Sequence, residues 1–153
     1  MSNNKVLIVE DEADVRLGYH VLLKANRYDT FFAVDGVTAI SEARKHQPDL
    51  IILDLGLPAG DGFTVLERFQ ANTYLSMIPV IVVSARNLHE NKERALRGGA
   101  RAFVQKPWSD EILLAIIAKL IAPGELSLSQ VNYGQRLKDI GGFRAQNSES
   151  IGD

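Results

Sequence analysis

The chain has 153 residues, which fits one domain of ordinary size with a short extension. It contains no cysteine, which excludes disulfides and thiolate metal sites, and its 46% hydrophobic residues are enough to build a core. The net charge of −2 provides no basic surplus, so direct binding of nucleic acid is not expected. The apolar run Val6–Val9 is too short for a signal peptide or a membrane span. We therefore expect a cytoplasmic protein that makes no contact with a membrane.

Short apolar segments recur along the chain and have the length of β-strands. They are Val6–Val9, Thr30–Val34, Leu50–Leu53, Val80–Val83 and Ala102–Val104. The first, third and fourth are rich in Val, Ile and Leu and do not alternate with polar residues, which is typical of central parallel strands covered on both faces. The second and fifth segments are less uniform, and we expect them nearer the edges of a sheet.

Segments with helical spacing of apolar residues follow each of these strands. They are Asp14–Ala25, Val37–Lys45, Gly62–Asn72, Leu88–Arg97 and a helix that runs from its cap at Ser109 to Ile121. We expect Asp14 to cap the first helix, and Gly98 with Gly99 to end the fourth. Five repeats of strand and helix predict an α/β fold, with a parallel sheet between two layers of helices.

The composition changes after Ile121. The segment 122–153 is rich in glycine and serine, and its few apolar residues are scattered. We expect one domain over residues 1–121 and a flexible tail or linker over 122–153, with docking of this segment on the domain or on a partner as the alternative. The chain is either a unit that acts alone or a piece of a longer protein.

Polar side chains stand where the predicted strands end. Glu10 and Asp11 follow the first strand, Asp54 follows the third, Ser84 the fourth and Lys106 the fifth. The carboxyl ends of parallel strands meet at one edge of the sheet, where sites of open α/β folds form. Three carboxylates placed together repel one another unless a cation is bound, and ligands that are all oxygen suit Mg²⁺. A magnesium site beside Lys106 is therefore expected at this edge.

Each of these residues also has an ordinary explanation. Glu10 and Asp11 favour the start of a helix, and Asp54 is a common type of turn residue before Gly56. Ser84 would equally suit a helix cap, and Lys106 the solvated end of a strand. These explanations would all have to hold together, and they leave the clustering unexplained.

The same residues carry a resemblance to a known family. Over Lys5–Ile121 the chain resembles the receiver domains of bacterial response regulators. The matching stretches are Val6–Glu12, Asp54–Pro58, Asp61–Gly62, Ser84–Ala85, Gly99–Ala100 and Lys106–Pro107. The resemblance implies a flavodoxin-like, doubly wound sheet of five parallel strands in the order 2-1-3-4-5, with five helices.

The resemblance also implies a phosphoacceptor. Asp54 would take a phosphoryl group from the phosphohistidine of a sensor histidine kinase or a phosphotransfer protein. Glu10, Asp11, Asp54 and the backbone carbonyl of Gly56 would hold Mg²⁺. Lys106 would pair with the carboxylate and then with the phosphoryl oxygens. Such a domain carries a signal and is not an enzyme, although it assists its own phosphorylation and dephosphorylation.

A switch is the second implication of the resemblance. Ser84 would donate a hydrogen bond to the phosphoryl group, and the rotamer of Phe103 would follow Ser84. The face made by the fourth helix, fifth strand and fifth helix would then change its contacts with a partner or with a second copy. The family pattern also makes the Lys106–Pro107 peptide bond cis. As a separate hypothesis, Arg86, two residues after Ser84, sets the lifetime of the phosphoryl group.

Three other functions agree less well with the sequence. A phosphatase with an aspartate nucleophile usually has a second Asp two residues later, where this chain has Gly56. A nucleotide- or flavin-binding domain would carry a Gly-x-Gly-x-x-Gly loop after the first strand, and none is present. A receiver that has lost its chemistry and acts only as a docking scaffold is disfavoured because every expected site residue is present.

Overall fold

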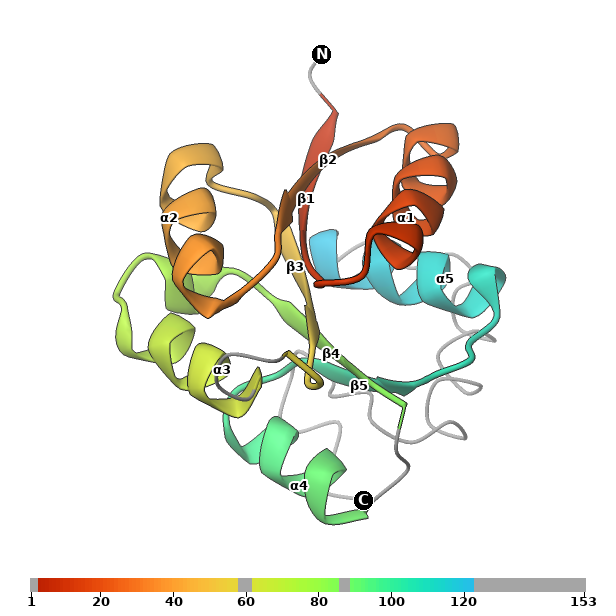
Figure 1. Cartoon of the computed structure of the whole chain (residues 1–153). Helices are drawn as coiled ribbons and strands as arrows, with labels where there is room; N and C mark the ends of the chain where they lie inside the picture. The colour runs from red at the N-terminus through yellow and green to blue at the C-terminus, as the bar shows by residue number, and fades with distance from the viewer. Residues whose placement is uncertain (1–2, 58–61, 86–88, 123–153) are drawn as a thin grey trace.

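A computed structural model of the chain describes residues 3–57, 62–85 and 89–122. Within these ranges, five parallel strands form one sheet in the order β2-β1-β3-β4-β5, with helices on both faces (Figure 1). The predicted fold and strand order are thereby confirmed. The predicted tail beyond Ala122 lies outside the described residues, as do Pro58, Asp61, Arg86 and Leu88.

The elements alternate along the chain as the sequence predicts. The strands are β1 (Asn4–Val9), β2 (Tyr28–Ala33), β3 (Leu50–Asp54), β4 (Val80–Ser84) and β5 (Ala102–Gln105). The helices are α1 (Ala13–Ala25), α2 (Gly36–His46), α3 (Gly62–Ala71), α4 (His89–Arg97) and α5 (Asp110–Ile121), with a short 3-10 turn, η1 (Leu75–Met77), before β4. None of the helices within the described ranges is long and apolar enough to cross a membrane.

The sheet has two apolar faces, and successive residues of a strand point to opposite ones. Leu7 and Ile51 pack with residues of α2, α3 and α4, whereas Ile8 and Ile52 pack with residues of α1 and α5. Figure 1 shows the same division, with α1 and α5 on one side of the sheet and the other three helices on the opposite side. Both faces are therefore buried, which explains why the central strands show no polar alternation.

The first helix begins one residue earlier than predicted, and Asp14 is not its cap. Glu12 occupies the capping position without a side-chain hydrogen bond, and Asp14 lies in the first turn. The backbone N–H of Glu12 donates instead to the side chain of Glu10, at 3.2 Å. The prediction of Asp14 as a cap was wrong because the chain turns into the helix immediately after the acidic pair. Asp14 still favours the positive end of the helix dipole.

The boundaries of α2 and β2 differ from the predicted ones, because local hydrogen bonds and strand register set them. The second helix starts at Gly36, where Asp35 caps it, because its carboxylate accepts from the backbone N–H of Thr38 at 2.8 Å. These bonds hold the pKa of Asp35 below its ordinary value. Strand β2 covers Tyr28–Ala33 rather than Thr30–Val34, because its pairing with β1 ends at Ala33.

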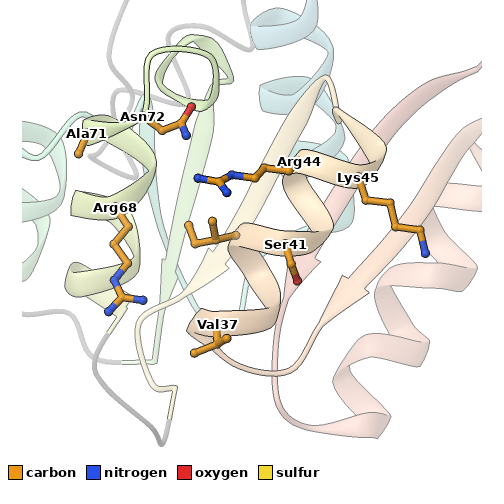
Figure 2. A pocket seen from close by; sticks show the side chains of 8 residues that line it. Val37, Ser41, Arg44, Lys45, Arg68, Ala71 and Asn72 are labelled. Carbon is orange, nitrogen blue, oxygen red and sulfur yellow. The ribbon is translucent and has the colours of Figure 1, made fainter.

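The second and third helices lie side by side and leave a groove between them (Figure 2). The helices meet closely at one end, since a Cβ on Gly36 would lie 2.8 Å from Cγ2 of Val65. Away from that contact the groove opens, with Arg44 on α2 and Arg68 on α3.

Gly62, the first residue of α3, lies against the end of β3. A Cβ at this position would come within 2.8 Å of both the Asp54 carbonyl oxygen and the Leu55 Cα, which are backbone atoms. We expect Gly62→Ala to lower the free energy of unfolding by roughly 1–3 kcal/mol, because the backbone must shift. Gly18 has nothing within 4 Å of the same atom, so Gly18→Ala should raise it by about 0.5–1 kcal/mol. Urea unfolding of both variants tests this, and equal effects would contradict it.

Candidate functional site

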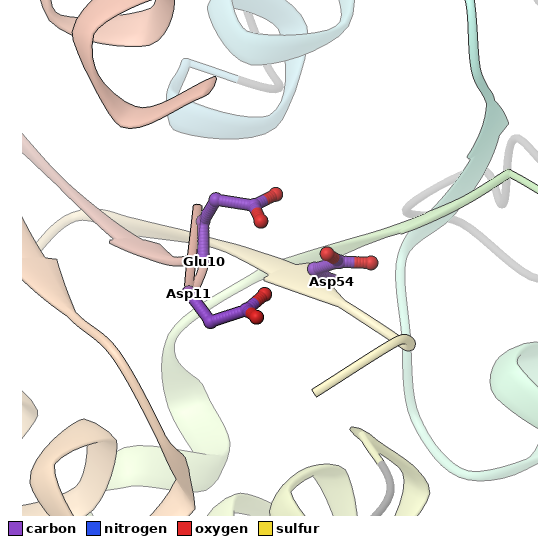
Figure 3. Close-up of side chains that lie close together, drawn as sticks. All are labelled: Glu10, Asp11 and Asp54. Atoms are coloured by element: carbon purple, nitrogen blue, oxygen red, sulfur yellow. The ribbon is translucent and has the colours of Figure 1, made fainter. Parts of the chain in front are cut away.

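Three carboxylates meet at the carboxyl edge of the sheet (Figure 3). Glu10 and Asp11 follow β1 directly, and Asp54 is the last residue of β3. One carboxylate oxygen from each lies within 4.8 Å of the others. Glu10 and Asp54 are buried, whereas Asp11 is exposed. The structure therefore brings together the acidic residues that the sequence predicted to meet.

The ends of β4 and β5 complete this edge. The register pairs Asp54 with Val83, and Ser84 with Gln105. The backbone N–H of Lys106 donates to the Ser84 carbonyl oxygen at 2.8 Å, which continues the ladder past the last residue of β5. Ser84 is buried, and the Lys106–Pro107 peptide bond is cis, as predicted.

Lys106 provides a cation next to the acids. Its Nζ lies 3.4 Å from Oε1 of Glu10 and 3.5 Å from Oδ2 of Asp54. The other oxygen of Asp54, Oδ1, accepts from the backbone N–H of Gly56 at 3.0 Å. Both oxygens of Asp54 are therefore held in place, one by charge and one by the backbone.

Glu10 is fixed by partners that the sequence analysis did not identify. Arg16, on α1, donates from Nη1 to the Glu10 carbonyl oxygen at 2.9 Å. The backbone N–H of Glu10 donates to the Ala33 carbonyl oxygen at 3.0 Å, so β2 also holds it. Arg16 follows the acidic pair by five residues. In the sequence alone it looks like an ordinary exposed cation of a helix.

The electrostatics of the cluster favour the uptake of positive charge. Burial, together with the nearby Asp54 carboxylate, raises the pKa of Glu10 from 4.5 to about 7, against the backbone N–H of Glu12 and the charge of Lys106. Burial is also the main reason why the pKa of Tyr19 lies above its ordinary value, and the charges of Glu10 and Asp54 add to it. Lys106 alone therefore does not compensate the acids.

The donor set fits a hard divalent cation. Three carboxylates from two adjacent strands supply oxygen ligands only, which is what Mg²⁺ prefers. The ligand atoms are close enough together for one ion, and such an ion would keep Glu10 in its ionised form. The residues present therefore fit a magnesium ion.

Two aromatic residues lie on β5 or shortly after it. Phe103, on β5, is buried on the face that packs against α2, α3 and α4. Trp108, three residues after β5, stacks on Tyr19 of α1 with ring centroids 5.4 Å apart, so it packs against the first helix. Since Trp108 is the single tryptophan of the chain, its fluorescence reports on this edge of the sheet.

Comparison with known proteins decides the family. The sequence pattern of the response regulator receiver domain matches residues 6–118, which run from within β1 to near the end of α5. The chain belongs to the response regulator receiver domain family. Receiver domains are signalling phosphoacceptors rather than enzymes in the usual sense, and they bind Mg²⁺ in an acidic site.

Curated receiver relatives differ in how much of their length the chain spans. The Polar-differentiation response regulator DivK of Brucella anthropi is 38% identical over 105 residues, which are 68% of this chain and 85% of that protein. Response regulator PleD of Caulobacter vibrioides is 36% identical over 76% of this chain, and the match spans 26% of its own length. The phosphate regulon regulator PhoB of Escherichia coli is 34% identical over 74% of this chain and 49% of its own length. The chain therefore spans about a quarter to a half of the last two relatives.

Solved receiver structures share the fold. A response regulator from Chloroflexus aurantiacus superposes with a TM-score of 0.75 at 25% identity, over 79% of this chain and 99% of that one. The receiver domain of a sensor histidine kinase of Pseudomonas aeruginosa gives a TM-score of 0.72 at 25% identity, over 78% of this chain and 98% of that one. In the latter structure a magnesium ion is coordinated in the active site cleft.

The raised pKa of Glu10 predicts a pH dependence of stability in metal-free buffer. A carboxyl whose pKa is higher in the folded than in the unfolded state stabilises the fold fully below pH 4.5, and this contribution is lost as the pH rises through about 7. The free energy of unfolding of the wild type, minus that of Glu10→Gln, should therefore fall across this window. Glu12→Gln removes an exposed carboxyl nearby and is the control. A difference that stays constant across the window would contradict the shift.

Proposed function

We propose that this receiver accepts a phosphoryl group on Asp54 from the phosphohistidine of a sensor histidine kinase or a phosphotransfer protein. The observation that supports it most directly is the position of the Asp54 carboxylate, beside two further carboxylates and the ammonium of Lys106. Membership of the receiver family and the complete set of site residues support it as well.

In the proposed reaction, a bond forms between an oxygen of Asp54 and phosphorus as the bond from phosphorus to the donor imidazole breaks. The transition state carries charge on the equatorial phosphoryl oxygens, so positioning and charge neutralisation provide most of the catalysis. Lys106 lies within reach of that charge, and the Gly56 N–H orients Asp54. Bound Mg²⁺, held by Glu10, Asp11, Asp54 and the Gly56 carbonyl, would supply further neutralisation of charge.

The phosphorylated domain would act as a signal rather than as a turnover catalyst. Self-catalysed transfer and later autodephosphorylation are both part of the proposal. The helix α5 ends at Ile121, which supports a receiver boundary at that residue, with 122–153 as a tail or linker. Arg86, two residues after Ser84, would set the lifetime of the phosphoryl group.

The proposed switch joins Ser84 to Phe103. Ser84, at the end of β4, would move toward the phosphoryl group and donate a hydrogen bond to it. Phe103, on the neighbouring strand β5, is already buried, so a shift of Ser84 would change the packing of Phe103 and of the face made by α4, β5 and α5. This face is our candidate for contact with a partner or a second copy of the chain.

Phosphorylation of Asp54 can be measured directly. After incubation with acetyl phosphate and Mg²⁺, the intact mass should rise by one labile phosphoryl group. Asp54→Asn should show no such gain, and neither should the wild type in EDTA, because the acceptor or the neutralising cation is then missing. Lys106→Met should reduce the gain. A wild type that binds Mg²⁺ but gains no mass would favour the docking-scaffold alternative.

The switch makes a separate prediction for Ser84→Ala. This variant should still gain the phosphoryl group, although more slowly, because Asp54 and Lys106 are unchanged. Hydrogen exchange in α4, β5 and α5 should change on phosphorylation of the wild type and much less in the variant. Light scattering on the same samples tests whether a dimer forms. Equal exchange changes in both proteins would disprove a role for Ser84 in the switch.

A further inference from the structure

The residues of the groove between α2 and α3 have no role in the proposed phosphoryl transfer. It has a volume of about 790 Å³ and is lined by Val37, Ile40, Ser41, Arg44, Lys45, Arg68, Ala71 and Asn72. Apolar side chains come from both helices, and every charged residue in its lining is basic. Figure 2 shows Arg44 extending toward α3, Arg68 along the opposite wall, and Lys45 pointing away. The two arginines are therefore the cations that a ligand in the groove would meet.

These two arginines have no counter-charge in the part of the chain that the structure describes. Arg44 and Arg68 are both exposed, and neither forms an ion pair there. On the same helices, Glu42 pairs with His46 at 3.2 Å, and Glu67, also exposed, precedes Arg68 by one residue, which directs it to a different side of the helix. The groove is therefore positively charged, although the whole chain carries a net charge of −2.

Exposed apolar side chains lie at one end of the groove and next to its other end. Val37, at the start of α2, is 73% exposed. A second hollow of about 480 Å³ shares Arg44 and Asn72 with the groove and is also lined by Tyr74, which is 82% exposed. Contiguous exposed apolar surface is a feature of protein interaction sites, and here it adjoins a charged groove.

We propose that this groove, from Val37 to Tyr74, binds an acidic amphipathic helix of a partner protein. Apolar residues of such a helix would cover Val37, Ile40 and Tyr74, and its carboxylates would pair with Arg44 and Arg68. The 11 residues of α2 extend over about 16 Å, which matches about three turns of a docked helix. A nucleic acid fits less well, because the exposed apolar ends of the groove offer nothing to phosphates.

This binding would not depend on phosphorylation. The residues that line the groove do not include Glu10, Asp11 or Asp54 of the carboxylate site. An Asp54→Asn variant should therefore bind the helix as the wild type does. The docking proposal and the phosphoacceptor proposal can accordingly fail separately.

The test uses the full chain labelled with ¹⁵N and a synthetic peptide of about 14 residues, with leucines on one helical face and glutamates flanking them. We expect amide shifts to change in α2, in Arg68–Asn72 and around Tyr74. Arg44→Glu or Arg68→Glu should each weaken binding roughly threefold to tenfold. Lys24→Glu makes the same change of charge on α1, in the opposite layer of helices, and should leave the affinity unchanged.

Several results would overturn the proposal. They are the absence of binding at millimolar peptide, equal weakening by Lys24→Glu, and amide shifts confined to α1 and α5. A peptide of the same composition with its leucines and glutamates scrambled should bind more weakly, and equal binding would mean that charge alone is recognised. A single-stranded oligonucleotide that produced the same shifts with higher affinity than the peptide would assign the groove to nucleic acid instead. Thermal unfolding shows that each variant is folded before titration.

Discussion

The parallel pairing of the strands is the constraint on which this receiver depends. Because β1, β3, β4 and β5 all run in one direction, their carboxyl ends lie at the same edge, and residues distant in the sequence meet there. Glu10 and Asp54 become neighbours in this way, and the backbone bond from Lys106 to Ser84 extends the edge past β5. Each polar residue follows or ends a strand that is buried on both faces, so the sheet fixes where its backbone lies. A site that must orient a nucleophile gains from this.

Burial gives the cluster its chemical character. A carboxylate such as Glu10 is costly to ionise when it is buried beside a second carboxylate, and one ammonium at 3.4 Å does not remove that cost. The site is therefore most stable with an added cation or with a proton. Even without a phosphoryl group, the site has uncompensated negative charge that a magnesium ion would neutralise. The same charge couples metal binding, pH and stability at one edge of the fold.

The two layers of helices have different relations to this edge. The layer of α1 and α5 packs beside it, through Arg16 on Glu10 and through Tyr19 on Trp108. The layer of α2, α3 and α4 contacts it through Gly62, at the start of α3, and leaves a basic groove farther along. If both proposals hold, one domain of this size provides a phosphoacceptor, a face that responds to it and a separate docking surface. The proposed docking surface adds a means of choosing partners that does not depend on the phosphorylation state.

The sequence by itself determined the order of strands and helices, both apolar faces and which polar residues stand at the carboxyl edge of the sheet. Non-alternating apolar runs such as Leu50–Leu53 are typical of strands buried on both faces, so the polar residues directly after them lie at a strand end. It did not determine where helices begin, as the roles of Glu12 and Asp35 show, because those positions depend on which hydrogen-bond partner the backbone finds. Nor did it determine the contact of Arg16 with Glu10, the raised pKa of that carboxyl, or the groove between α2 and α3. These features depend on distances between separate elements and on burial, which only tertiary packing decides.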